Sequence, residues 1–230
     1  MAPPIRTGLD QRLDEVRAHL EAFFKVVTKS IEEAKVAVGT GGEASGKRTR
    51  KMRRKAQRRA EEISQDLLLI LALNQPLVQD LRVVATLLRG VDTLERVARH
   101  ARDVVRDLAR WKVIANDAAA LPEPFRAHID AMIAEVEIMF EALRACTLKG
   151  DAIDEDTIAD AWRRIGSFHH KARKSCITAS FDELGGEEGR ILLSGVARRI
   201  ERSGYNLVRW VDLWHHATEN EWIHIEDENE

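Results

Sequence analysis

The stretch "ALNQPLVQDLRVV", residues 72–84, places a proline inside an otherwise continuous helical pattern. Proline lacks an amide donor and biases the residue before it away from helical geometry, so Pro76 predicts the end of a helix. Proline is tolerated in the first turn of a helix, where its amide would have no partner, so Pro76 also suits the start of the next one. The stretch therefore predicts a junction between two helices of a bundle.

Apolar residues recur at helical spacing on both sides of this junction, and the few glycines and prolines cluster between such segments. We expect six long helices, over residues 9–38, 47–75, 77–111, 125–148, 155–180 and 190–218. Asp154 is the expected N-cap of the fifth. No segment shows the two-residue alternation of a strand. The predicted class is all-α, with antiparallel helices side by side in bundles.

The third and sixth predicted helices share a pattern, because "VDTLERVARHARDVV" (91–105) can be aligned with "ARRIERSGYNLVRWV" (197–211). The paired positions are Glu95 with Glu201, Arg96 with Arg202, and Ala98 with Gly204. The small residue would let a neighbouring helix approach closely. Together with the helix count, the repeat predicts two tandem three-helix bundles, over residues 1–118 and 119–230.

The junction and the two Glu-Arg patterns resemble those of the PhoU family, which are phosphate-transport accessory and regulatory proteins built from two tandem three-helix bundles. The matching residues are Gln75, Pro76, Asp80, Arg82, Glu95 and Arg96 in the first half, and Glu201, Arg202 and Gly204 in the second. Asn74 stands in for the family's usual arginine. The resemblance implies a regulator of phosphate uptake or phosphate signalling that contacts a phosphate transporter or a sensor histidine kinase.

The resemblance also implies multinuclear iron or zinc clusters, which the family binds through acidic residues four positions apart on one helix face. In this chain Arg99 replaces the acid that should follow Glu95, and Tyr205 replaces the one that should follow Glu201. We expect Arg99 to neutralise Glu95 instead of joining it as a ligand. The candidate metal ligands are Glu62, Asp66, Asp92, Glu95 and Glu201. A metal-storing or metal-sensing bundle is therefore an alternative hypothesis.

Three further potential ligands, His169, His170 and Cys176, lie on the fifth predicted helix. Neighbouring residues on a helix point about 100° apart, so the two histidines cannot both share a face with Cys176. We interpret Cys176 as a small core residue and the histidines as partly exposed.

The segment "GKRTRKMRRKAQRRAEE", residues 46–62, is strongly basic. Its cations are Lys47, Arg48, Arg50, Lys51, Arg53, Arg54, Lys55, Arg58 and Arg59. Because they surround the helix, we expect this end to project into water without packing on the core. An acidic protein surface, anionic lipid beside a transporter, or nucleic acid could bind it. The net charge of −2 and the lack of interleaved aromatic residues argue against nucleic acid, so a nucleic-acid-binding adaptor is the weakest alternative.

Other classes of protein are disfavoured by missing motifs. The chain contains no nucleophile motif and no HExxH, and "GTGGEASGK" (39–47) departs from a P-loop and follows a predicted helix, so we do not expect an enzyme. The two cysteines form no CxxC pair. The first ten residues lack the apolar core of a signal peptide, and no apolar run reaches about 18 residues, so we expect a cytoplasmic protein that meets the membrane only through its transporter partner.

We also expect a dimer or larger homo-oligomer. We expect the tryptophans at positions 111, 162, 210, 214 and 222 to fill the core or a seam between helices. Trp210 and Trp214, four residues apart on the last predicted helix, could also extend an apolar patch used in self-association.

Overall fold

The computed structural model describes residues 7–42, 46–74, 76, 78–115 and 120–225, and most of them are helical. The helices are α1 (Thr7–Gly39), α2 (Gly46–Asn74), α3 (Gln79–Ile114), α4 (Glu123–Lys149), α5 (Glu155–Thr178), α6 (Phe181–Leu184) and α7 (Gly186–Glu219). No strand occurs among these described residues. The predicted all-α class with six long helices is confirmed, and the short α6 is an addition that the sequence did not indicate.

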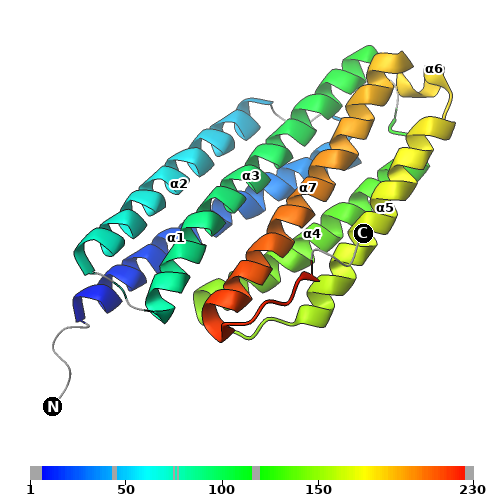
Figure 1. Cartoon of the computed structure of the whole chain (residues 1–230). Helices are drawn as coiled ribbons and strands as arrows, with labels where there is room; N and C mark the ends of the chain where they lie inside the picture. Colours follow the sequence, from blue (N-terminus) through cyan, green and yellow to red (C-terminus); the bar gives the residue numbers. More distant parts are fainter. Residues whose placement is uncertain (1–6, 43–45, 75, 77, 116–119, 226–230) are drawn as a thin grey trace.

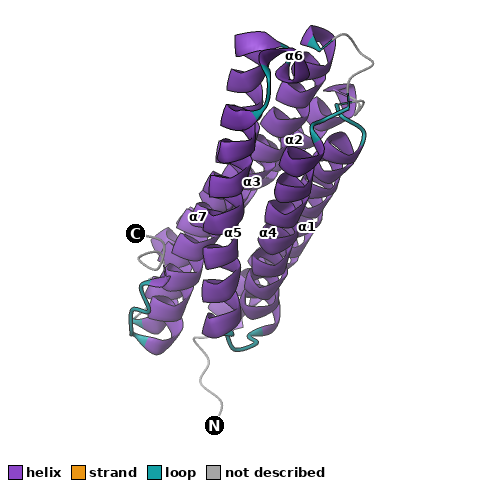
Figure 2. Cartoon of the chain, turned by 90° about the vertical axis from the view of Figure 1, so that its right-hand side faces the viewer, coloured by secondary structure: helices purple, strands orange, loops and turns teal. Residues whose placement is uncertain are grey.

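The helices form two three-helix bundles that lie side by side (Figure 1). In the first, α2 packs on α1 and α3; in the second, α5 packs on α4 and α7. The bundles meet mainly where α3 lies along α7, with α1 against α4 as a second contact. Figure 2 shows the elongated shape that results from helices running along a common direction. The predicted tandem arrangement is confirmed, whereas the predicted boundary between residues 118 and 119 lies outside the described residues.

The junction at Pro76 differs in one detail from the prediction. α2 ends at Asn74 and Pro76 is a buried, non-helical residue, as a helix-terminating proline should be. However, α3 begins only at Gln79, so the prediction that Pro76 occupies the first helical turn is wrong. The chain reverses direction here through Val78, whose φ of 44° lies in the left-handed region that a β-branched residue rarely adopts. The reversal therefore needs more residues than the proline alone.

The connections before and after α5 show where local signals succeed and fail. Asp154 caps α5, because its Oδ1 accepts a hydrogen bond from the Thr157 amide at 3.1 Å. By contrast, the glycines of residues 185–189 do not delay the last helix, which begins at Gly186. At Gly189 an added Cβ would lie 1.7 Å from the Leu184 carbonyl oxygen. Glycine serves here to let α6 pack against the first turn of α7, and not to break the helix.

Aromatic rings fill the seam between the two bundles. Trp210 is 1% exposed and stacks on Phe24, with 5.9 Å between ring centroids. It also lies against Gly90 of α3, where an added Cβ would sit 2.1 Å from the indole Cε2. The prediction that Trp210 fills a seam between helices is therefore confirmed, and the hypothesis of a self-association patch is wrong for Trp210.

The basic helix packs on its neighbours in spite of its charge. Buried residues recur along one face of α2: Thr49, Ala56, Ala60, Ile63, Leu67 and Ile70. The prediction that its first half projects into water is wrong, because small residues at helical spacing leave one face free of cations. The second half is not wholly buried, since Leu68, Leu69 and Leu73 are 55%, 49% and 63% exposed.

Candidate functional site

Arg82, one of the motif residues, ties the start of α3 to the end of α7. Its Nε donates to the Ala217 carbonyl at 3.4 Å, and its Nη1 donates to Asn220 Oδ1 at 2.9 Å. Gln79 adds a bond from Nε2 to the Thr218 carbonyl at 3.4 Å. Carbonyls in the last turn of a helix have no partner within the helix, so these side chains cap α7. The sequence pattern identified Arg82 but gave no indication of this role.

The other motif residues have structural positions of their own. Gln75 lies outside the described residues, Asp80 lies in the first turn of α3, and Arg96 is exposed. At Gly204 an added Cβ would lie 2.7 Å from Ile165 Cδ1 of α5. The prediction that the small residue admits a neighbouring helix is confirmed for Gly204.

The two motif glutamates are both largely covered, and neither is followed by an acid four residues later on its own helix. Arg99 Nη2 lies 3.5 Å from Glu95 Oε2, which confirms the predicted pairing. Burial raises the pKa of Glu201, whose contact with Arg202 Nε is long at 3.9 Å. Tyr205 stands where the family has an acid four residues after Glu201, and the Arg202 Cζ lies 5.5 Å from the centroid of the Tyr205 ring.

The remaining candidate ligands are dispersed. Arg59 Nη1 lies 2.7 Å from Glu62 Oε2, His19 Nδ1 lies 2.9 Å from Asp66 Oδ2, and Asp92 is exposed. Within the described ranges, no three His, Cys, Asp or Glu side chains are placed to hold a metal ion. The donor set does not fit the clusters that the resemblance implies, because the acids are paired with Arg and His or separated. We therefore derive no role through a metal.

A buried ion-pair network at the α3–α7 seam was missed by the sequence reasoning. Arg199 Nη1 lies 2.8 Å from Asp107 Oδ2, and Arg106 Nη2 lies 2.9 Å from Asp107 Oδ1. The Asp107 side chain is only 7% exposed. A signal for it exists in the sequence, since Asp107 falls on the apolar stripe of the third predicted helix, where a carboxylate needs a partner. Removing Arg199 would leave Asp107 with the half-exposed Arg106 as its partner, so we expect a cost below the roughly 3–5 kcal/mol of an isolated buried charge.

His100 lies next to this network. Its Nδ1 is 3.2 Å from Ser203 Oγ on α7. Burial, reinforced by the neighbouring Arg99, lowers the pKa of His100 to about 4. The ring is therefore neutral at neutral pH and serves as a polar link between α3 and α7.

The outer face of α2 forms a shallow hollow lined only by cations, which we call the α2 basic face. Its residues are Lys47, Arg50, Lys51, Arg54, Lys55 and Arg58. The other three cations of the basic run are turned elsewhere: Arg48 Nε lies 2.7 Å from Glu33 Oε1, Arg59 pairs with Glu62, and Arg53 is half-buried. The predicted basic patch is thus divided into an outward cationic face and three cations that lie outside the hollow, two of them paired with glutamates.

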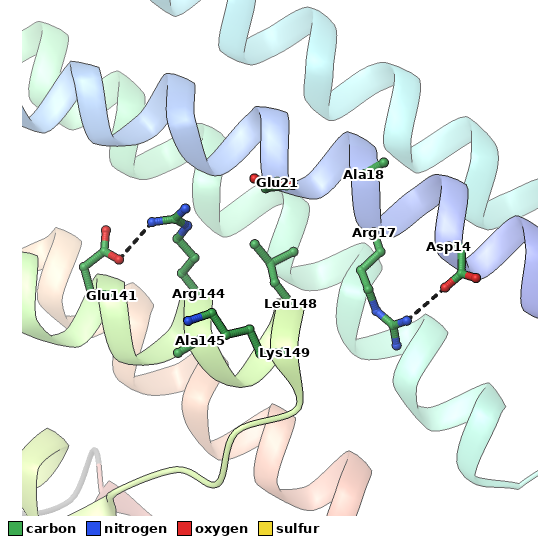
Figure 3. A pocket seen from close by; sticks show the side chains of 9 residues that line it. All are labelled: Asp14, Arg17, Ala18, Glu21, Glu141, Arg144, Ala145, Leu148 and Lys149. Carbon is green, nitrogen blue, oxygen red and sulfur yellow. Dashed lines mark hydrogen bonds and ion pairs between the residues drawn. The ribbon is translucent and has the colours of Figure 1, made fainter.

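A groove between the start of α1 and the end of α4 gives a useful contrast (Figure 3). Its arginines are paired within their own helices, Arg17 with Asp14 at 3.0 Å and Arg144 with Glu141 at 3.1 Å. Glu21 also lines the groove, and its hydrogen bond with Lys25 lowers its pKa. Because its charges are compensated, this groove has no electrostatic preference for a charged ligand.

Two tandem three-helix bundles with Glu-Arg patterns on α3 and α7 give the chain an architecture similar to that of PhoU proteins. Residues 20–108 match the family model of the PhoU domain. Over 102 residues the chain is 29% identical to the "Phosphate-specific transport system accessory protein PhoU homolog" of Pseudomonas putida. That match covers 44% of this chain and 40% of the relative, less than half of each.

Two solved structures share the fold over almost the whole chain. PhoU from Pseudomonas aeruginosa matches with a TM-score of 0.82 and 19% identity, covering 92% of this chain and 99% of that one. The phosphate transport system regulatory protein PhoU from Streptococcus pneumoniae matches with a TM-score of 0.77 and 16% identity, covering 93% and 98%. The resemblance to the PhoU family is confirmed, and the match to the PhoU domain model spans residues 20–108.

Proposed function

We propose that this chain regulates phosphate uptake or phosphate signalling by contact with a phosphate transporter or a sensor histidine kinase, and not by catalysis. The match of residues 20–108 to the PhoU domain carries the proposal, with the PhoU fold over 92% of the chain in support. The name of the P. putida relative describes an accessory protein of a phosphate-specific transport system. Within the described residues, no helix is both long and apolar enough to span a bilayer.

The partner contact in this proposal lies on α2. This helix packs on α1 and α3 at one side of the molecule, opposite α5 (Figure 1). Its first half presents the α2 basic face, and its second half exposes Leu68, Leu69 and Leu73. A protein surface with acidic groups beside an apolar patch would complement both halves, and charge complementarity would speed its association.

Co-purification with the phosphate transporter and phosphate-sensing kinase of the host tests this proposal. Lys51→Glu with Lys55→Glu reverses charge on the α2 basic face. Lys29→Glu with Lys174→Glu is the matched control, because both lysines are exposed and lie on other helices. We expect the first pair to abolish recovery of the partner and the control pair to retain it, with equal thermal stability of both variants. Failure of the unaltered chain to recover either protein would refute the proposal.

A homo-oligomer remains part of the proposal. Light scattering on the purified chain should give a mass at least twice the 26.0 kDa of one chain. A measured mass equal to that of one chain over the accessible concentration range would refute the proposed homo-oligomer.

A further inference from the structure

A second cationic hollow lies on the surface between α5 and α7, away from the α2 basic face. Arg173 of α5 lines it together with Arg190, Arg198 and Arg202 of α7, and Glu201 is its single carboxylate. The α7 residues recur at intervals that place them along one face of the helix. Four arginines against one carboxylate make this hollow the opposite of the compensated α1–α4 groove.

The positive charge in this hollow is poorly offset by the protein itself. Among the described residues, neither Arg173 nor Arg198 has a carboxylate partner in an ion pair. The one acid, Glu201, reaches only 3.9 Å from Arg202, and burial raises its pKa. The pKa of His169, also in the lining, is lowered by burial and then by Arg173 and Arg198. The hollow therefore has an unmet preference for an anion.

The internal repeat shows that the first half of the chain does not carry this charge at the corresponding positions. In the alignment of the two motif helices, Arg198 of α7 stands at the position of Asp92 of α3. If the same alignment is extended by more than two turns toward the start of α7, Arg190 stands at the position of the buried Val84 of α3. The second bundle thus has cations at positions where the first has an acid and an apolar residue. Packing of the bundle does not require Arg198, because it is exposed.

We propose that the hollow between α5 and α7 binds a phosphate-type oxyanion, gripped by Arg173 from one helix and Arg198 from the other. Guanidinium groups present paired N–H donors that match two oxygens of such an anion. Arg190 is held at the edge of the hollow, because its Nη2 donates to the Ala179 carbonyl at 3.2 Å. The binding site is independent of the partner contact on α2. The phosphate group can come from the free inorganic ion or from a small molecule that carries it, such as a nucleotide.

Calorimetric titration of the full chain with inorganic phosphate, and separately with ATP, tests the site. We expect saturable binding that Arg198→Ala and Arg173→Ala each weaken at least about tenfold, since hydrogen bonds between charged groups commonly contribute that much. Arg198→Lys should bind more tightly than Arg198→Ala but more weakly than the unaltered chain, because lysine keeps the positive charge but lacks the paired N–H donors of the guanidinium. Binding of inorganic phosphate identifies the free ion as sufficient, and binding of ATP alone identifies a carried phosphate group.

Two matched controls separate this site from general attraction to positive charge. Lys51→Ala with Lys55→Ala removes charge from the α2 basic face, and Arg144→Ala removes it from the α1–α4 groove. Both should leave the affinity within about twofold, because ionic attraction without a built site is weak and screened. As a second readout, the bound anion should raise Tm in the unaltered chain and in the controls but not in Arg198→Ala.

The proposal is overturned if neither inorganic phosphate nor ATP binds saturably. It is also overturned if the α2 variant loses as much affinity as Arg198→Ala, because binding would then follow the total charge. Since co-purification with a transporter or kinase does not enter these titrations, this result stands or falls separately from the proposed function.

Discussion

Gly90→Ala tests how tightly α3 and α7 are packed together. The added methyl would lie 2.1 Å from Cε2 and 2.2 Å from Cζ2 of Trp210. Carbon atoms in contact normally stay about 3.5–4.0 Å apart, so something must move. Trp210 cannot withdraw easily, because it is 1% exposed and stacked on Phe24. The overlap must therefore be relieved by separating the two helices or by tilting the ring out of its stack.

The expected cost follows from two opposing effects. Overpacking a well-filled core costs about 1–3 kcal/mol. Alanine in place of glycine within a helix returns up to about 1 kcal/mol. We expect a net loss of about 1–2 kcal/mol in the free energy of unfolding. For a chain of this size, that loss corresponds to a fall in Tm of roughly 2–8 °C.

Equilibrium unfolding in urea, followed by circular dichroism and tryptophan fluorescence, measures this loss. Gly39→Ala is the matched control, because nothing lies within 4 Å of a Cβ added at that helical glycine. The control should be as stable as the unaltered chain or slightly more stable. In a Trp210→Leu background the penalty of Gly90→Ala should shrink, since the two residues are in direct contact. If Gly90→Ala were as stable as Gly39→Ala, the close approach of α3 and α7 at this position would be refuted.

Three further predictions concern single side chains. Arg82→Ala should cost about 1 kcal/mol and accelerate amide hydrogen exchange in the last turn of α7, because that turn loses its cap. Burial raises the pKa of Cys146 to about 11 and also raises that of Cys176, so a thiol reagent at pH 8 should label both only after unfolding. Burial lowers the pKa of His100 from 6.5 to about 4, so between these pH values the unfolded chain binds more protons than the folded one, and the free energy of unfolding falls as the pH drops. His100→Gln should make the free energy of unfolding less dependent on pH in this range, as measured by thermal melts at several pH values. An unchanged pH dependence would contradict the assignment.

Features set by neighbouring residues could be predicted from the sequence. Pro76 ends α2, Asp154 caps α5, and Arg99 pairs with Glu95, each within four residues of its effect. The PhoU resemblance then supplied the order of the helices in space. Chemistry that acts within one helical turn is visible in a single sequence, because backbone geometry fixes which residues meet.

Features that need two distant helices could not be predicted. The fit of Trp210 against Gly90 joins residues from opposite halves of the chain, and the spacing within each helix gives no indication of the pairing. The cationic hollow was missed for the same reason, since Arg173 and Arg198 come together only when α5 lies on α7. The basic run was misjudged because counting charges around α2 overlooked small residues such as Ala56 on its packed face.

The continuity of α7 limits how this chain can change in evolution. Arg198 lines the hollow with α5, and further along the same unbroken helix Trp210 fills the seam with α3. Inserting or deleting one residue between them would rotate one against the other by about 100°. Either the arginine or the indole would then face the wrong neighbour. Substitutions can accumulate along this segment, but its length should stay constant among relatives that keep both the hollow and the seam.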